Sequence, residues 1–148
     1  MAEAGDVPAL VALETASFAL DRISPRSWRR LLVQPGARVL VAPGSAAIDG
    51  ALVLLFRRHA RIGRIYSIAV AAEARGIGIG GMLIEWAALL AAVAGCTAVR
   101  LETRIDNRPA QALFARHGFK ATGRADGYYQ DGTAALRLER PIHTHHCR

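Results

Sequence analysis

The sequence predicts an α/β domain, and three observations support this fold class. The chain has 148 residues, the length of one domain with a sizeable core. Hydrophobic residues make up 52% of it, as in a globular rather than a disordered chain. Segments with helical and strand-like patterns alternate in the order α, α, β, β, β, α, β, α, β, β. We therefore expect a single domain over residues 1–148, with a frayed tail from about residue 141 to 148.

Two helices are expected first. Residues 8–20 repeat apolar side chains at helical spacing. The second helix begins after Ser24, an N-cap that is followed by proline at the first helical position, and it ends before Pro35. Glu14 and Asp21 lie in this region, either as solvated carboxylates or as contacts for a substrate.

A three-stranded meander is expected next. Residues 38–42, 47–56 and 64–70 are apolar and strand-like. Pro43-Gly44-Ser45 forms the first turn, and residues 57–61 form a basic hairpin tip.

The longest helix is expected over residues 80–94, with Gly95 as its C-cap. Alanine fills most of the positions that larger apolar residues leave, so we expect this helix to be buried nearly all round. The larger residues at helical spacing are Met82, Trp86, Leu89, Leu90 and Val93.

The remaining elements alternate between strand and helix. A strand over 97–104 contains Glu102, and Asn107 then caps a short helix that ends at Gly118. The last two strands are expected over 119–124 and 134–138, with a turn at 128–132 between them.

A glycine-rich loop, Arg75-Gly76-Ile77-Gly78-Ile79-Gly80-Gly81, joins the third strand to the long helix. Each glycine costs about 1 kcal/mol relative to alanine in a helix interior. Glycine suits a tight turn whose backbone something must approach. The free N–H groups of a first helical turn, at the positive end of the helix dipole, bind anions. The loop therefore predicts a phosphate-binding site.

Three known phosphate-binding motifs can be compared with this loop. The dinucleotide fingerprint needs G-x-G-x-x-G, and the nucleoside-triphosphate loop needs a lysine after its last glycine; neither fits. Arg75, Gly78 and Gly80 fit Arg-x-x-Gly-x-Gly, which resembles the acyl-CoA loop of the GCN5-related N-acetyltransferase (GNAT) superfamily. A glycine-rich turn before a buried helix, without a ligand, is the alternative.

A second motif begins 32 positions after Arg75. It reads Asn107-x-x-Ala110-x-x-Leu113-Phe114-x-x-x-Gly118-Phe119, which is similar to the second GNAT signature, N-x-x-A-x-x-L-Y-x-x-x-G-F. The resemblance covers roughly residues 8 to 140. It is closest to the bacterial ribosomal-protein alanine N-acetyltransferases, which share the shape of Leu101-Glu102-Thr103-Arg104 and of Gly127-Tyr128-Tyr129.

The resemblance implies a specific architecture. A central mixed, mostly antiparallel twisted sheet of six to seven strands would be flanked by about four helices. Only about six residues precede the first helix, so the first strand is expected to be short or missing. A second copy of the chain could complete such an exposed edge, which leaves a homodimer open.

The resemblance also implies which residues contact acetyl-CoA, the expected co-substrate. The third strand would pair with the pantetheine arm through its backbone, and the glycine-rich loop would hold the pyrophosphate by backbone N–H groups. Asn107 would hydrogen-bond the cofactor. The expected contacts are Ile68, Ala69, Val70, Arg75, Gly76, Ile77, Gly78, Ile79, Gly80, Gly81, Asn107 and Phe114.

For catalysis, Glu102 matches the general base of the alanine acetyltransferases. Peptide α-amines have a pKa near ~8 and lysine amines near ~10.4, so a carboxylate that removes a proton is useful. The alternative is a cross-strand charge partner of Arg100 or Arg104. The family's general-acid tyrosine is Phe114 here, which has no proton to give. Tyr128 or Tyr129 could supply that proton, shape the acceptor pocket or simply pack in the hairpin.

Three functions remain open: acetylation of a protein N-terminal or lysine amine, acetylation of a small amine (amino acid, polyamine or antibiotic), and non-catalytic binding of acyl-CoA. Neither a secretory signal nor a membrane span is evident, so we expect a cytoplasmic protein without a membrane partner. The net charge is +7 and all but one of the 19 basic residues are Arg. No basic run is interleaved with aromatics, so nucleic acid is not an expected partner. Cys96 and Cys147 lack metal-ligand spacing, and no metal is expected.

Overall fold

The computed structural model describes residues 1–17, 23–44, 48–57 and 60–143. The helices are α1 (Val7–Ser17), α2 (Pro25–Val33), α3 (Ile79–Val93) and α4 (Arg108–Arg116), with short 3-10 turns η1 (Ala4–Asp6) and η2 (Ala72–Ala74). The strands are β1 (Ala37–Pro43), β2 (Ile48–Phe56), β3 (Ile62–Val70), β4 (Ala98–Arg104), β5 (Lys120–Ala125) and β6 (Ala135–Pro141). Asp21 lies outside the described residues.

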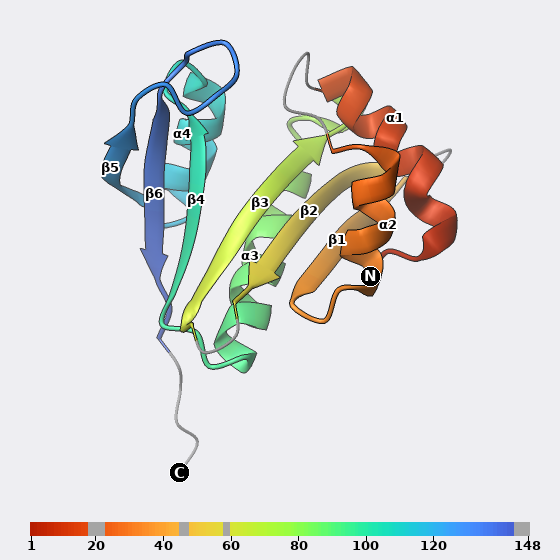
Figure 1. Ribbon diagram of the computed structural model, residues 1–148, viewed down its shortest axis with the longest axis horizontal. Helices are drawn as coiled ribbons and strands as arrows, with labels where there is room; N and C mark the ends of the chain where they lie inside the picture. Colours follow the sequence, from red (N-terminus) through yellow and green to blue (C-terminus); the bar gives the residue numbers. More distant parts are fainter. Residues whose placement is uncertain (18–22, 45–47, 58–59, 144–148) are drawn as a thin grey trace.

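The strands form one open sheet in the order β1-β2-β3-β4-β6-β5 (Figure 1). Neighbours pair in antiparallel fashion except β3 and β4, which are parallel. The crossover from β3 to β4 contains α3, as a parallel pair requires. The predicted mixed, mostly antiparallel sheet with four helices is confirmed.

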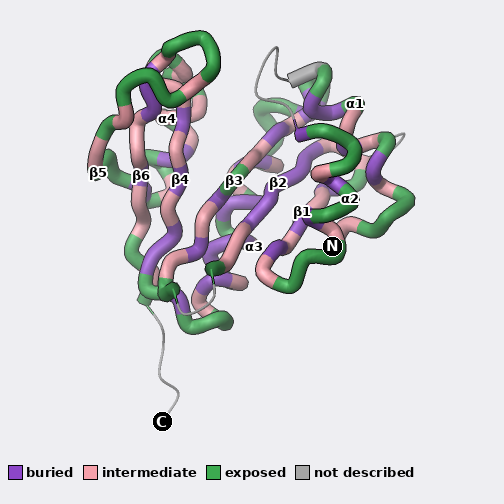
Figure 2. Tube along the Cα trace, in the orientation of Figure 1, coloured by how far each residue is buried: buried purple, intermediate pink, exposed green. Residues whose placement is uncertain are grey.

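Two hydrophobic clusters hold the helices to opposite faces of the sheet. Leu83, Ile84 and Phe114, from α3 and α4, pack with one face. Leu10 and Trp28, from α1 and α2, pack with the other face of β1, β2 and β3. β2 therefore lies between two layers and is buried along much of its length (Figure 2).

A β-bulge interrupts β3 at Tyr66. Val53 pairs with Ser67 and the next residue, Leu54, pairs with Ile65, which leaves Tyr66 as the extra residue. The bulge changes which side chains face which layer: Ile65 packs with the α3 cluster, whereas Ala69 packs with α1 and α2. Without the bulge, these two residues would lie on the same face.

The parallel pair is short. Residues 62–65 of β3 pair with residues 98–101 of β4, and beyond Ile65 and Leu101 the strands diverge (Figure 1). Each continues to pair with its other neighbour, β3 with β2 as far as Val70 and β4 with β6 as far as Arg104. The sheet is therefore split at one end.

Residues near both ends of the described chain contact the sheet. Among the described residues no strand precedes α1. The N-terminal segment contacts the sheet instead through one hydrogen bond, in which the Ala2 N–H donates to the Val39 carbonyl at 2.9 Å. At the other end, Pro141 still pairs with Ala98 and Ile142 donates to the Thr97 carbonyl at 2.8 Å, so β6 continues to where a frayed tail was expected to begin. None of the helices described is long and apolar enough to span a bilayer.

The prediction that the long helix is buried nearly all round is wrong. Met82, Leu89 and Val93 of α3 are 52%, 62% and 80% exposed. Small alanines, including Ala87 and Ala91, instead face the sheet. The physical reason is that the sheet covers only one side of α3.

Two glycines of the loop motif allow α4 to approach α3. A Cβ on Gly80 would lie 3.1 Å from Leu113 Cδ2, and one on Gly81 would lie 2.7 Å from His117 Nε2. His117 is further fixed because its Nδ1 lies 2.7 Å from Glu85 Oε2, and Arg140 donates to the same carboxylate at 2.8 and 3.2 Å. These contacts tie α3, α4 and β6 together.

Replacing Gly81 by alanine should therefore strain the α3–α4 contact. We expect Gly81→Ala to destabilise the protein by about 1–3 kcal/mol, because the new methyl group overpacks against the His117 ring. Urea denaturation measures this, with Gly5→Ala as control because a Cβ at Gly5 meets nothing within 4 Å. In the His117→Ala background, Gly81→Ala should cost little. An equal cost in both backgrounds would contradict this account.

The Glu85 contacts predict a pH dependence of stability. The hydrogen bond from Arg140, followed by that from His117, holds the pKa of Glu85 below its ordinary value of 4.5. A carboxyl with a depressed folded-state pKa stabilises the protein above the unfolded pKa, and this contribution is lost as the pH falls through the folded pKa. Glu85→Gln should thus lower the melting temperature at pH about 7 and change it much less at pH about 3. Glu73→Gln, which changes an exposed glutamate of η2, is the control, and an equal difference at both pH values would refute the prediction.

Candidate active site

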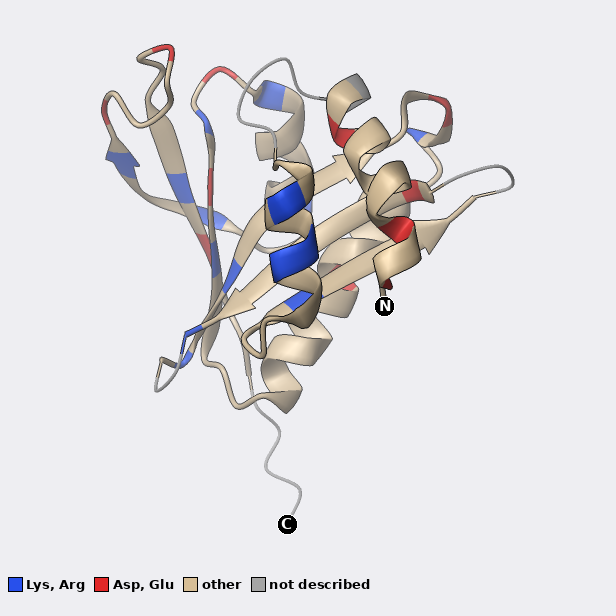
Figure 3. Cartoon of the chain, turned by 45° about the vertical axis from the view of Figure 1, so that its right-hand side comes forward, with Lys and Arg blue, Asp and Glu red and all other residues tan. Residues whose placement is uncertain are grey.

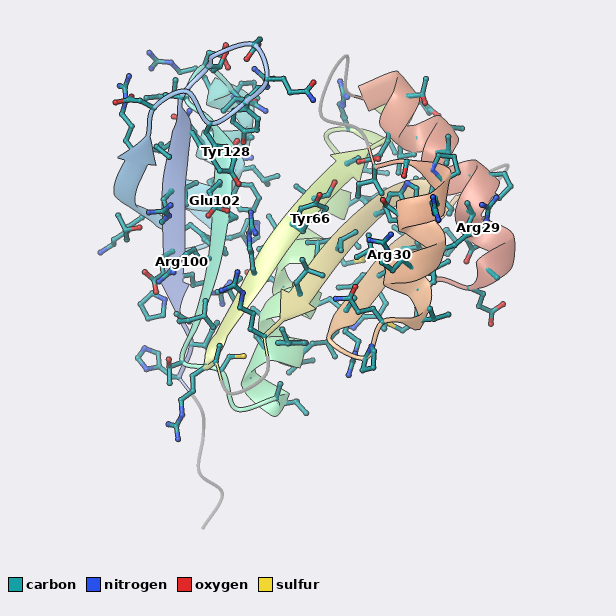
Figure 4. The ribbon with its side chains drawn as sticks, viewed as in Figure 1. Arg29, Arg30, Tyr66, Arg100, Glu102 and Tyr128 are labelled. Atoms are coloured by element: carbon teal, nitrogen blue, oxygen red, sulfur yellow. The ribbon has the colours of Figure 1, made fainter. Side chains whose placement is uncertain are left out.

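The gap between the diverging strands is a cleft of about 910 Å³. β3 and β4 form its walls, α4 closes one end, and the loop before β6 lies over it (Figure 4). Its lining includes six of the predicted site residues, namely Ile68, Glu102, Asn107, Phe114, Tyr128 and Tyr129. A cavity of this size with a few convergent polar groups is typical of a ligand site.

Glu102 projects from β4 with only 12% of its side chain exposed. Arg64 Nε donates to its Oε2 at 3.1 Å, and Arg137 Nε lies 3.7 Å from its Oε1. The charge partners are therefore not Arg100 or Arg104, which pair with Glu139 and Asp131. Basic and acidic residues alternate along β4 and β6 on this part of the sheet (Figure 3).

Arg64 also reaches the loop before β6. Its Nη2 donates to the Tyr128 hydroxyl at 3.0 Å, and its guanidinium carbon lies 5.7 Å from the centre of the Tyr66 ring. One guanidinium thus links β3, β4 and the loop. Because the Tyr128 oxygen accepts this bond, its own O–H remains a donor.

Tyr129 and Asp131 fasten the same loop to the end of β4. The Arg104 guanidinium lies 4.4 Å from the centre of the Tyr129 ring and donates to Asp131 at 2.8 Å. Hydrogen bonds from Thr133 and then Arg104 hold the pKa of Asp131 below its usual range. The Tyr128 and Tyr129 rings pack edge to face, 4.9 Å apart.

α4 contributes a polar and an apolar residue to the cleft. Asn107 accepts the Ala110 N–H at 3.2 Å, which confirms it as the N-cap. Phe114 is 2% exposed and packs edge to face against Phe119, with ring centres 5.2 Å apart. It is a wall residue without a polar atom to offer.

The glycine-rich loop lies next to the cleft lining rather than within it. Gly76 and Gly78 both have φ of +87°, and a Cβ at either position would meet nothing within 4 Å. Gly78 is the N-cap of α3. Within the described part of the chain, none of the amides of residues 76–81 donates to a backbone carbonyl. Arg75 folds back so that its Nε donates to the Val70 carbonyl at 3.4 Å.

The remaining predicted cofactor contacts have different surroundings. Ala69 is buried against α1 and α2, so only its backbone is available to a ligand. Val70 ends β3, between the cleft and the loop. On the side that faces β4, residues 66–70 have no strand partner among those described. No cluster of three His, Cys, Asp or Glu side chains suited to a metal occurs within the described ranges.

Sequence reasoning missed several cleft residues, above all Arg64 and Tyr66 on β3. The alternation of side chains along a strand predicts that Arg64 and Ile65 point to opposite faces of the sheet. No local pattern, however, identifies Glu102 on the parallel strand β4 as the partner of Arg64. The β-bulge at Tyr66 could not be predicted either, because no glycine at or next to this position marks it in the sequence.

Glu14 is not a solvated carboxylate, since it is 3% exposed. It accepts the Ile23 N–H at 2.7 Å and the Ser67 hydroxyl at 3.3 Å. Ile23 and Ser67 both line the cleft. Glu14 therefore holds two residues of the cleft wall, Ile23 and Ser67, in place through hydrogen bonds.

An open sheet that divides between two parallel strands, with a glycine-rich loop at the head of the crossover helix, is the architecture of the acetyltransferases that the sequence resembles. Comparison with solved structures supports this fold. The crystal structure of the ribosomal-protein-S18-alanine N-acetyltransferase from Escherichia coli superposes with a TM-score of 0.85 at 21% identity, covering 98% of this chain and 93% of that one.

A sequence model of the Acetyltransferase (GNAT) family matches residues 9–119, and the chain belongs to this family. A putative ribosomal protein bS18 alanine N-acetyltransferase of Bacillus subtilis is 28% identical over 127 residues, 85% of this chain and 82% of that protein. An N-alpha-acetyltransferase of Saccharolobus solfataricus is 38% identical over 84 residues, 55% of this chain and 50% of that protein. The chain spans 62% or less of the curated relatives it matches at 34–38% identity.

The position of Glu14 predicts a stability effect. Glu14→Ala should cost about 2–3 kcal/mol, because it leaves the buried Ile23 N–H without its charged acceptor. Urea denaturation measures the loss. Glu73→Ala, an exposed glutamate on η2, should stay within about 0.5 kcal/mol of the parent protein. Similar small effects for both variants would show that the buried contacts of Glu14 are not stabilising.

Proposed function

We propose that this chain is an acetyl-CoA-dependent N-acetyltransferase whose acceptor is a protein N-terminal amine or a lysine amine. One observation carries the proposal: the split between β3 and β4 places Glu102 in a cleft next to a loop whose amides have no backbone acceptor in the described chain. The names of the archaeal and Bacillus relatives support a protein acceptor.

The acetyl donor, acetyl-CoA, would bind along β3, with its pyrophosphate at the glycine-rich loop. Amides of residues 76–81, at the positive end of the α3 dipole, suit the pyrophosphate of CoA. The backbone of residues 66–70 suits the amide groups of the pantetheine arm, because it lacks a strand partner toward β4. The thioester would then lie in the cleft, within reach of Asn107 on α4.

The transfer itself needs a proton acceptor. The neutral amine attacks the thioester carbonyl, the C–N bond forms and the C–S bond breaks, and the CoA thiolate leaves. The amine proton passes to Glu102, directly or through water. A thiol has a pKa near ~8.5, so its thiolate leaves without a strong acid. The Tyr128 hydroxyl, whose proton is available, would protonate the departing thiolate. Phe114, at the position of the family's tyrosine, has no proton to give.

Exposure favours a peptide over a small amine. Tyr66 and Tyr128, on opposite sides of the cleft, are 49% and 44% exposed, so the acceptor side opens to solvent. A small molecule would favour a more enclosed site. The alternative of a non-catalytic acyl-CoA-binding module rests on Phe114 in place of the family's tyrosine.

A turnover assay tests the proposal. The protein is incubated with acetyl-CoA and peptides that begin with alanine, lysine peptides blocked at the N-terminus, or small amines, and thiol release is followed. We expect turnover of peptides, and a loss of about 10²–10⁴ in kcat/KM for Glu102→Gln with acetyl-CoA affinity unchanged. The control is Glu139→Gln, a carboxylate on β6 that pairs with Arg100 outside the cleft.

The other outcomes separate the alternatives. Turnover of small amines alone would favour the second function. Calorimetric binding of acetyl-CoA with no turnover of any amine would favour the non-catalytic module. Absence of binding would refute the proposed cofactor site.

A further inference from the structure

Arg64 lies at the point where the two parallel strands begin to separate. It pairs in register with Arg100 on β4, one residue before the last rung of the parallel pair. Its side chain lines the cleft, where its Nε and Nη2 donate to two different residues, Glu102 and Tyr128. Neither the family motifs nor the proposed proton route assigns it a role.

The geometry requires a guanidinium. The two donors of Arg64 are held in one rigid plane and point to acceptors on separate elements, a carboxylate on β4 and a phenol oxygen on the loop. A lysine ammonium at the end of a flexible stem is a point charge and does not fix two acceptors in one plane. Arg137 approaches only the far oxygen of Glu102, at 3.7 Å.

We propose that Arg64 is a positioning residue that sets the Glu102 carboxylate and the Tyr128 hydroxyl relative to each other in the cleft. This inference rests on the proposed acetyl transfer. Arg64 does not exchange a proton itself; it acts through the other two side chains. It also holds Tyr128, a half-exposed loop residue, against the strands, so the loop takes up its place over the acceptor side.

Steady-state kinetics with the whole chain, acetyl-CoA and a peptide that the parent protein acetylates test this role. Arg64→Met should lower kcat by about 10–100-fold, because a misplaced general base and hydroxyl lose their alignment with the reacting atoms. The KM for acetyl-CoA should stay within about twofold, since the donor loop is not touched. Arg100→Met is the matched control: it removes the guanidinium that lies opposite Arg64 in the parallel register, where Arg100 pairs with Glu139 at 3.7 Å.

A double-mutant cycle separates positioning from general structural damage. Tyr128→Phe should cost about tenfold in the parent protein but less than about twofold in Arg64→Met or Arg64→Lys, because the hydroxyl is no longer held there. Arg64→Lys should recover part of kcat, because its charge still pairs with Glu102. Calorimetric binding of CoA shows that each variant is folded.

The two ideas fail in different ways. If the parent protein acetylates peptides but Arg64→Met stays within twofold of it, or if the effects of Arg64→Met and Tyr128→Phe simply multiply, the role of Arg64 is refuted and the proposed function stands. If the parent protein turns over no amine, the proposed function is refuted and this inference with it.

Discussion

The structure depends on how briefly β3 and β4 pair. Interior strands of a sheet normally satisfy their backbone groups on both sides, because an unpaired buried amide or carbonyl costs about as much as a lost hydrogen bond. Here the pairing ends at Ile65 and Leu101, while both strands run on beside their other neighbours. The Tyr66 bulge bends β3 at that point, and the cleft is the result. The groups left over are suited to an extended ligand that carries amides of its own.

The two sequence motifs are parts of one piece of packing. Gly76 and Gly78 provide the left-handed backbone that turns the chain into α3. Gly80 and Gly81 have another role, since they leave room for Leu113 of α4 and for His117, the C-cap of that helix. The helix that carries Asn107 and Phe114 is thus seated directly on the first turn of α3. A change in the glycines after Gly78 would therefore move the far wall of the cleft as well as the loop.

The order of the elements and their caps could be predicted from the sequence because these depend on local chemistry. Ser24 and Asn107 cap their helices as predicted, whereas the C-cap of α3 is Ala94 and the predicted Gly95 follows it with positive φ. Burial was harder to predict. Apolar spacing shows which residues share a face of α3 but not whether a layer covers it, and Met82 and Val93 are exposed. Contacts between distant segments, such as Arg64 with Glu102, depend on a parallel register and a bulge that no local pattern encodes.

The replacement of tyrosine by phenylalanine at position 114 has a structural consequence. A hydroxyl carried by α4 would be fixed by the core, since Phe114 is 2% exposed and packs against Phe119. Tyr128, the proton donor that we propose, instead lies in a loop, and a loop holds a functional group less accurately than a packed helix. The loop here is fastened by charged contacts, from Arg104 to Asp131 at one end and from Arg64 to Tyr128 over the cleft. Because each of these arginines projects from a sheet strand, the hydroxyl is ultimately positioned by the same two diverging strands that create the cleft.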